Sequence, residues 1–483
     1  MRSFFSTSID YCIALVCLVF FLLPITNGVP YSDDAVVHFA ADIARSSDSG
    51  NDFIQETLSS IKTWATVNGR FNPIISFINY SLNSGLENYH IYKWIMYVMN
   101  LVAFLSAALL WKKWIGRRFP SAIFLIYSLA SIQFCITYHD AYNCFGLMYP
   151  FLITTGCLSI YYLAIYADSF QKKHLLISSV LWVSCLMTIE VSFLFLGILL
   201  LFFIDRKIRL NALVPHIAIC ALYLGFLIFL KLQIDNKPEY SGLVSHFDFN
   251  KIIWVVYCQV KSCLPTSSIF ANTIPWDKYV QTASYSWITI LLLILGSFAS
   301  IWTNLSIKKM TPTALQILAG LVFLVGPATM ISTSVKYQSE VTERWFYIVI
   351  FVQILGSAIL FTFLFLSTIW FRYISLCIIP IAIGLTYIHN IHQVEKGNRM
   401  FGAFVDIKPF LLKNKTHIKS KDTIVSYNFP IQHAEMQKAI LAHTKQSVSV
   451  IDLPSGANPY KIIVYQPDSI NKICFKNEKN PNH

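Results

Sequence analysis

The chain of 483 residues is poor in charged side chains, which make up only 13% of it. An ordinary soluble domain is about 25% charged, whereas this chain is 55% apolar and 15% aromatic. The imbalance excludes a soluble enzyme and a disordered chain. The 18 glycines and 18 prolines follow no pattern, so the chain is neither collagen-like nor of low complexity.

Several catalytic signatures are also missing. The sequence has no Gly-rich phosphate loop, no metalloprotease helix and no Gly-x-Ser-x-Gly elbow, and its eleven cysteines show no zinc-site spacing. A nucleotide-driven cytoplasmic reaction is therefore not expected. Cys258 and Cys263 share one predicted outward loop, where they form either a disulfide in an oxidising compartment or two free thiols.

What the sequence has instead is a series of long apolar runs. A helical membrane span needs about 20 such residues, and lipid requires the backbone to be helical. The first run could be a secretory signal, but the many that follow favour an uncleaved helix. We predict eleven spans: 11–27, 94–111, 119–137, 147–167, 175–188, 191–204, 212–230, 287–305, 314–333, 346–367 and 374–389.

The stretch 175–204 decides the orientation, because it is apolar except around Glu190. One helix would bury this carboxylate in lipid at a cost of about 2.5–3.5 kcal/mol, whereas two short helices place it at an interface. With two helices and an inward N-terminus, the inner loops carry twelve basic residues and the short outward turns only Lys336 and Arg344. These inner loops largely explain the net charge of +12, so we predict no nucleic-acid partner.

Three longer segments then face outward: a first outer loop over 28–93, a second over 231–286 and the tail 390–483. The tail contains short β-favouring runs separated by turn residues. We therefore predict an all-α membrane domain over 1–392 and a small α+β domain over 393–483. The β-favouring runs are Thr423–Phe429, Val448–Leu453 and Tyr460–Tyr465.

The candidate acids lie on the outer side. Asp33 and Asp34 follow the first span, where a carboxylate pair can act as a base or bind a hard cation. The alternative is a solvated loop in which Ser32 or Asp33 caps a following helix over Ala35–Ala44. His139 and Asp140 follow the third span, where they either mark the water boundary or join a site with Glu190 on the same face.

Outward arginines provide candidate phosphate ligands, because the guanidinium fork is planar and always charged. Arg344 stands in a short turn with Tyr337 and Glu343, and Arg70 follows a turn-forming Asn-Gly pair. The alternative for Arg344 is an ion pair with a neighbouring glutamate or a position at the interface.

Taken together, this pattern resembles the GT-C class of membrane glycosyltransferases. Asp33-Asp34 matches the acidic pair of the first outer loop, and Asp140 stands where a second outer acid is found. The short helices around Glu190 are similar to the compact helix pair of the class, and Arg344 matches an arginine that contacts the lipid phosphate. The loop has no Asp-x-Asp, so a requirement for a divalent cation (Mg²⁺ or Mn²⁺) stays open.

Size and layout are most similar to the bacterial O-antigen glucosyltransferases of serotype-converting phages. The resemblance implies an enzyme that transfers glucose from a polyprenyl-phosphate donor to a lipid-linked or lipopolysaccharide glycan. The reaction would take place at the periplasmic face of the bacterial inner membrane. The implied catalytic residues are Asp33, Asp34, Asp140 and Glu190, and the implied substrate-binding residues are Arg70, His139, Tyr337, Glu343 and Arg344.

Two other functions fit the layout, and a purely structural or receptor role is a further alternative. A Wzy-like O-antigen polymerase has a similar number of spans and large outer loops, but is expected to rest on outer arginines. A lipid or solute transporter or flippase would place charged residues in mid-membrane and show paired, broken helices.

Overall fold

The computed structural model describes most of the residues of the chain. They are 2–31, 34–35, 38–39, 53–78, 88–116, 119–135, 142, 147–233, 248–267, 269, 276–334, 338, 341, 349–413, 423–427, 440–441, 449–453, 461–465 and 472–476.

The chain forms two compact units. The first unit comprises Met1–Thr26, Ser59–Ile78 and Trp94–Val394. The second unit comprises Asn27–Leu58, Asn79–Lys93 and Glu395–His483. The predicted boundary at residue 392 falls inside one continuous helix, α17 (Ile369–Lys413).

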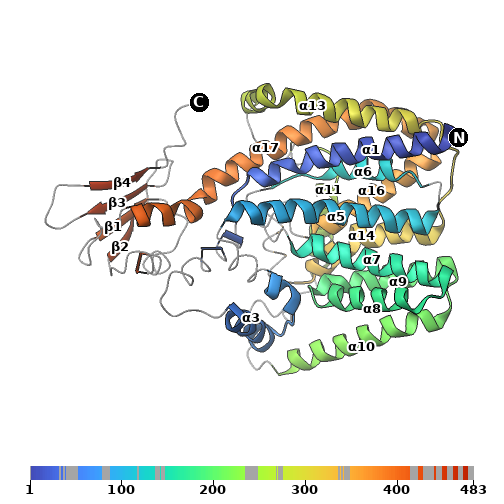
Figure 1. The fold of residues 1–483 in the computed structure, drawn as a ribbon, viewed down its shortest axis with the longest axis horizontal. Helices are drawn as coiled ribbons and strands as arrows, with labels where there is room; N and C mark the ends of the chain where they lie inside the picture. Colours follow the sequence, from blue (N-terminus) through green and yellow to red (C-terminus); the bar gives the residue numbers. More distant parts are fainter. Residues whose placement is uncertain are drawn as a thin grey trace. The chain divides into compact units, whose positions relative to one another are not determined.

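Long apolar helices build the first unit, in which they lie alongside one another (Figure 1). Among the described residues, eight helices are long and apolar enough to cross a membrane. This confirms the prediction of a predominantly helical, multi-pass membrane protein. The spanning helices are α1 (Arg2–Leu22) with its continuation η1 (Leu23–Asn27), α5 (Tyr89–Ile115), α7 (Met148–Ser169), α10 (Leu210–Leu232), α13 (Trp276–Asn304), α14 (Ala314–Ser332), α16 (Ile350–Ser367) and α17.

The three other predicted spans are helical but short. They are α6 (Ser121–Ser131), α8 (Lys172–Leu186) and α9 (Phe193–Arg206), of 11, 15 and 14 residues. The total of eleven spans therefore stays a prediction. Two further helices, α3 (Phe53–Asn68) and α11 (Phe249–Ser262), fall within the predicted outer loops.

Helix α6 ends six residues before the predicted end of its span. The chain continues without helix through Cys135. Side chains of α17 form hydrogen bonds with the backbone groups that have no helical partner there. Asn390 accepts a hydrogen bond of 2.8 Å from Phe134 N and donates one of 3.0 Å to Ile132 O, while His389 Nε2 lies 3.1 Å from Phe134 O. Irregular backbone is tolerated at membrane depth only where protein buries it in this way.

The stretch 175–204 forms two helices, as predicted. Helix α8 ends at Leu186, Ile189 is extended, and the 3-10 turn η2 (Glu190–Ser192) leads into α9. The Arg209 guanidinium, beyond the end of α9, lies 5.0 Å from the ring of Phe170, just before α8 begins. Helix α9 therefore returns to the end from which α8 starts.

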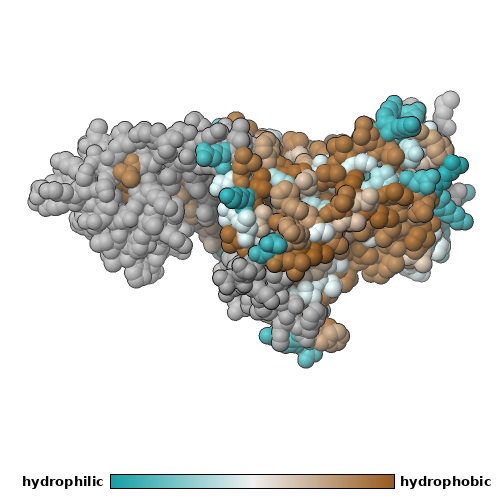
Figure 2. Space-filling view, turned by 90° about the horizontal axis from the view of Figure 1, so that it is seen from below, coloured by the Kyte–Doolittle hydropathy of each residue, from teal (hydrophilic) through white to brown (hydrophobic). Residues whose placement is uncertain are grey.

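Small residues allow α14 and α16 to approach closely. A Cβ atom on Gly356 would clash with Leu324 N and would lie 2.8 Å from Gly320 O, both on α14. Close van der Waals packing at small residues replaces the hydrophobic effect as the source of helix association in lipid. The outer surface of the first unit is largely hydrophobic in the view of Figure 2, and Leu222, Leu232 and Trp370 are each more than 70% exposed.

The second unit contains a four-stranded sheet in the order β2-β1-β3-β4. Strand β1 (Thr423–Tyr427) pairs in parallel with β2 (Ser449–Leu453) and antiparallel with β3 (Lys461–Tyr465), which pairs antiparallel with β4 (Lys472–Lys476). The first three strands coincide with the β-favouring runs of the sequence. Pairing with both β2 and β3 makes β1 an interior strand of the sheet.

Candidate functional site

Asp34 lies seven residues after η1 ends and is only 2% exposed. Its backbone N–H donates to Tyr31 O at 3.1 Å, which closes a turn after the first span. The Tyr92 hydroxyl, itself buried, donates a 2.7 Å hydrogen bond to Asp34 Oδ2. A buried carboxylate needs such a partner, because desolvation of the charge is costly.

Lys93 is fully buried in the same unit. Its Nζ lies 4.6 Å from the centre of the Tyr31 ring, within the range of a cation–π interaction. Tyr31 therefore contacts Asp34 through its backbone and Lys93 through its ring. The second unit thus holds one buried carboxylate and one buried ammonium group around the same tyrosine.

Asn398 of α17 fixes the segment that leads to Asp34. Its Oδ1 accepts hydrogen bonds from Val29 N at 2.9 Å and from the Tyr31 hydroxyl at 3.4 Å. Its Nδ2 donates to Asn27 O at 3.0 Å. The rings of Tyr31 and Phe401, whose centres are 5.8 Å apart, pack together and strengthen this attachment. The carboxylate is therefore placed by a helix near the other end of the chain.

A second pair of predicted site residues meets in the first unit. Arg70 Nε lies 3.3 Å from Glu190 Oε1, and their side chains are 19% and 24% exposed. Gly69, at a positive φ of 61°, turns the chain after α3, and Arg70 N donates to Trp64 O at 3.0 Å. Two segments that are 120 positions apart in the sequence are thereby joined by an ion pair.

The Tyr223 hydroxyl of α10 donates to Phe71 O and so fixes the residue next to Arg70. The Tyr223 ring also stacks on Phe193 at 6.1 Å, close in sequence to Glu190. Tyr223 therefore fixes residues close in sequence to both members of the ion pair. A charged pair that is fixed in this way, and still about a fifth exposed, is able to contact an anionic ligand.

The other predicted site residues, Asp33, His139, Asp140, Tyr337, Glu343 and Arg344, lie outside the described residues. Within the described part of the chain, no group of three or more His, Cys, Asp and Glu side chains stands ready to hold a metal ion.

Cys258 and Cys263 are both buried free thiols, so the disulfide alternative is not realised. Cys263 follows the last turn of α11, and its Sγ lies 3.4 Å from Gln259 O. Burial raises the pKa of each thiol above its ordinary value. Neither thiol is therefore an activated nucleophile.

Sequence reasoning did not single out Lys93 and Asn398. Lys93 had a signal, since it is a cation among aromatic residues at the start of a span. Asn398 had none, because it bonds mainly to backbone groups. Comparison of the chain with models of known protein families and with curated proteins gives no match.

Proposed function

We propose that the protein is a membrane glycosyltransferase of the GT-C kind, which transfers a sugar from a polyprenyl-phosphate donor to a lipid-linked or O-antigen glycan. The observation that carries the proposal is the buried Asp34 carboxylate, held by Tyr92 directly after the first span. In this proposal the membrane is the bacterial inner membrane. The N-terminus is cytoplasmic, and a small α+β domain over 393–483 is periplasmic.

The reaction needs one base. The acceptor hydroxyl oxygen attacks the anomeric carbon of the donor sugar, and the bond from that carbon to the phosphate oxygen breaks. The polyprenyl phosphate leaves with the electron pair, and the hydroxyl proton passes to the Asp34 carboxylate. Phosphate is a good leaving group, so no covalent enzyme intermediate is required.

Tyr92 and Lys93 support this role of Asp34. A phenolic hydrogen bond to Oδ2 fixes the rotation of the carboxylate and leaves it able to accept a proton. Lys93 adds a buried ammonium group on the ring of Tyr31, the residue whose carbonyl accepts from Asp34 N. Lys93 and Tyr92 are therefore positioning residues in this proposal, and Asp34 is the catalytic base.

Arg70 keeps its predicted role as a ligand of the donor phosphate, with Glu190 orienting its guanidinium. Arginine suits this role because its fork matches two phosphate oxygens at once. The same assignment is proposed for Arg344, and Asp33 and Asp140 stay proposed as further acids of the site.

The proposal is tested with Asp34→Asn in cells that carry the O-antigen pathway. Mass spectrometry of the released glycan should show one added hexose per repeat with the unchanged protein. Hexose transfer by the variant should be about 10²–10⁴-fold lower than by the unchanged protein. Asp277→Asn is the matched control, because Asp277 is an exposed acid at the start of α13 and loses the same charge.

Full transfer by the Asp34→Asn variant would overturn the role of Asp34. An unchanged repeat with altered chain length would instead indicate the O-antigen polymerase. A glycan unchanged in both respects would favour the transporter or flippase.

A further inference from the structure

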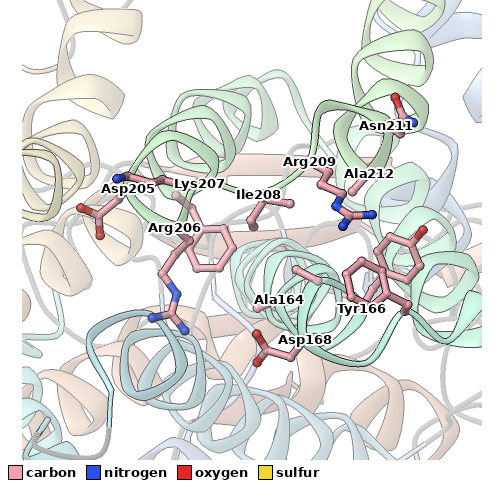
Figure 3. A pocket seen from close by; sticks show the side chains of 13 residues that line it. Ala164, Tyr166, Asp168, Asp205, Arg206, Lys207, Ile208, Arg209, Asn211 and Ala212 are labelled. Atoms are coloured by element: carbon pink, nitrogen blue, oxygen red, sulfur yellow. The ribbon is translucent and has the colours of Figure 1, made fainter.

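A cavity of about 580 Å³ lies in the first unit, where α7 ends and α9 turns into α10 (Figure 3). Its polar lining comes from Tyr166 and Asp168 of α7 and from the turn between α9 and α10. In the view of Figure 3, the Arg206 and Arg209 side chains diverge from that turn, on either side of Asp168. The glycosyl transfer proposed above makes no use of this cavity.

Three exposed cations stand on the turn itself. Arg206 ends α9, Lys207 adopts a left-handed conformation with φ of 49°, and Arg209 precedes α10. Ile208 N donates to Phe203 O at 3.2 Å, which closes the turn. The turn therefore concentrates three positive charges within four positions at the cavity.

The two carboxylates of the cavity already have partners. Asp168 forms an ion pair of 2.7 Å with Lys113. Asp205 accepts hydrogen bonds from Trp114, Thr313 and Gln316 at 2.8, 2.9 and 3.1 Å. With Lys113 included, four cations stand against two carboxylates, so the cavity carries an excess of positive charge.

The start of α10 adds to this positive field. Arg209 is the N-cap of α10, and its side chain makes no capping hydrogen bond. Asn211 and Ala212, in the first turn of α10, both line the cavity. The amide groups at the start of a helix attract anions, phosphate groups in particular. The Arg209 guanidinium is held by the ring of Phe170, 5.0 Å away.

The surface beside the cavity is apolar. Phe170, Ile204, Leu210 and Val214 are 57%, 56%, 62% and 53% exposed. These residues belong to the ends of apolar helices, where the head groups of a bilayer meet the acyl chains. A ligand that suits both surfaces has a phosphate group attached to hydrocarbon chains.

We propose that this cavity binds the head group of an anionic phospholipid, with the phosphate on Arg209, Lys207 and the start of α10. Basic hollows between membrane helices are the usual sites for such head groups. This proposal is independent of the enzymatic one, since it uses none of the same residues.

The test is native mass spectrometry of the full chain in detergent with equal amounts of phosphatidylglycerol and phosphatidylcholine. The unchanged protein should retain phosphatidylglycerol preferentially. The double variant Lys207→Gln, Arg209→Gln should bind phosphatidylglycerol about 30-fold more weakly, because each of the two charges contributes about a fivefold factor.

The matched control is Lys172→Gln with Lys173→Gln. These lysines are exposed at the start of α8 and lie outside the cavity lining. Their substitution removes the same amount of positive charge as the double variant. The control should change binding by about twofold or less. If the double variant does not fold, Arg209→Gln alone is measured in the same way.

Equal losses in the double variant and its control would overturn the proposal, because they would indicate general attraction to positive charge. Equal retention of the two lipids by the unchanged protein would also overturn it. Displacement of phosphatidylglycerol by excess inorganic phosphate would assign the cavity to a free anion and not to a lipid.

Discussion

Asn398 accepts a hydrogen bond of 2.9 Å from the backbone N–H of Val29, 369 positions earlier in the chain. The same side chain donates to Asn27 O. One asparagine of α17 thus satisfies two backbone groups of the segment between the first span and Asp34. Its role is to place the carboxylate, and it does not contact the reacting atoms in the proposed mechanism.

Replacement of Asn398 by Ala should lower transfer about tenfold or more and destabilise the second unit by about 1–3 kcal/mol, because Val29 N–H loses its acceptor. Asn398→Asp retains the acceptor oxygen and should keep more activity than Asn398→Ala. Hexose addition and thermal unfolding are measured for both. The control is Asn250→Ala, an exposed position on α11. Equal activity of the two Asn398 variants would contradict a role for the acceptor oxygen.

A charge reversal separates the two roles of the Arg70–Glu190 pair. Arg70→Glu and Glu190→Arg should each destabilise the first unit, and the double variant should recover about 0.5–3 kcal/mol of coupling. The double variant should not recover transfer, because the donor phosphate would then meet a displaced cation. Thermal unfolding and hexose addition are compared across the cycle. If the double variant recovers both stability and hexose transfer, the pair has only a structural role.

Eight of the predicted spans correspond to helices long and apolar enough to cross a membrane, because a long apolar run in lipid favours a helical backbone. The sequence also located the break near Glu190, since a lone carboxylate is costly within a span. It failed at the end of α6, where Asn390 replaces helical hydrogen bonds with its own side chain. Bonds of this kind have no periodic pattern and appear only when distant helices are packed together.

Gly356→Ala should destabilise the first unit by about 1–3 kcal/mol or more, because its Cβ would clash with the backbone of α14. Backbone atoms cannot rotate away as a flexible side chain would. Gly225→Ala is the control, since a Cβ there meets nothing within 4 Å. Both variants are compared by thermal unfolding in detergent. A Gly356 variant as stable as the Gly225 variant would show that α14 and α16 can separate without cost.

Cys258 and Cys263 should react slowly with N-ethylmaleimide at pH 7, because burial raises the pKa of both thiols and only the thiolate reacts. A raised pKa leaves less thiolate at neutral pH, so the reaction should accelerate as the pH rises. Peptide mass spectrometry follows the labelling, and protein unfolded in SDS provides full reactivity as the control. A peptide in which Cys258 and Cys263 are joined by a disulfide would contradict the free thiols of the structure.

Arg372 shows the same limit of sequence reasoning for a charged residue. Its position in a short loop predicted an inner-surface cation, yet the side chain is only 2% exposed. It donates to the carbonyls of Phe365, Leu366, Leu305 and Ile307, at the ends of α16 and α13. The count of basic residues indicates the side of the membrane, but it does not reveal which of them bind helix ends.

The bond between Val29 and Asn398 also sets an order of events during synthesis. A ribosome adds about 5–20 residues per second, so roughly 20–70 s pass between the appearance of Val29 and that of Asn398. The helices from α3 to α16 are synthesised in that interval. The surroundings of Asp34 are therefore completed only when α17 has emerged, and a nascent or prematurely terminated chain lacks the asparagine that holds this segment.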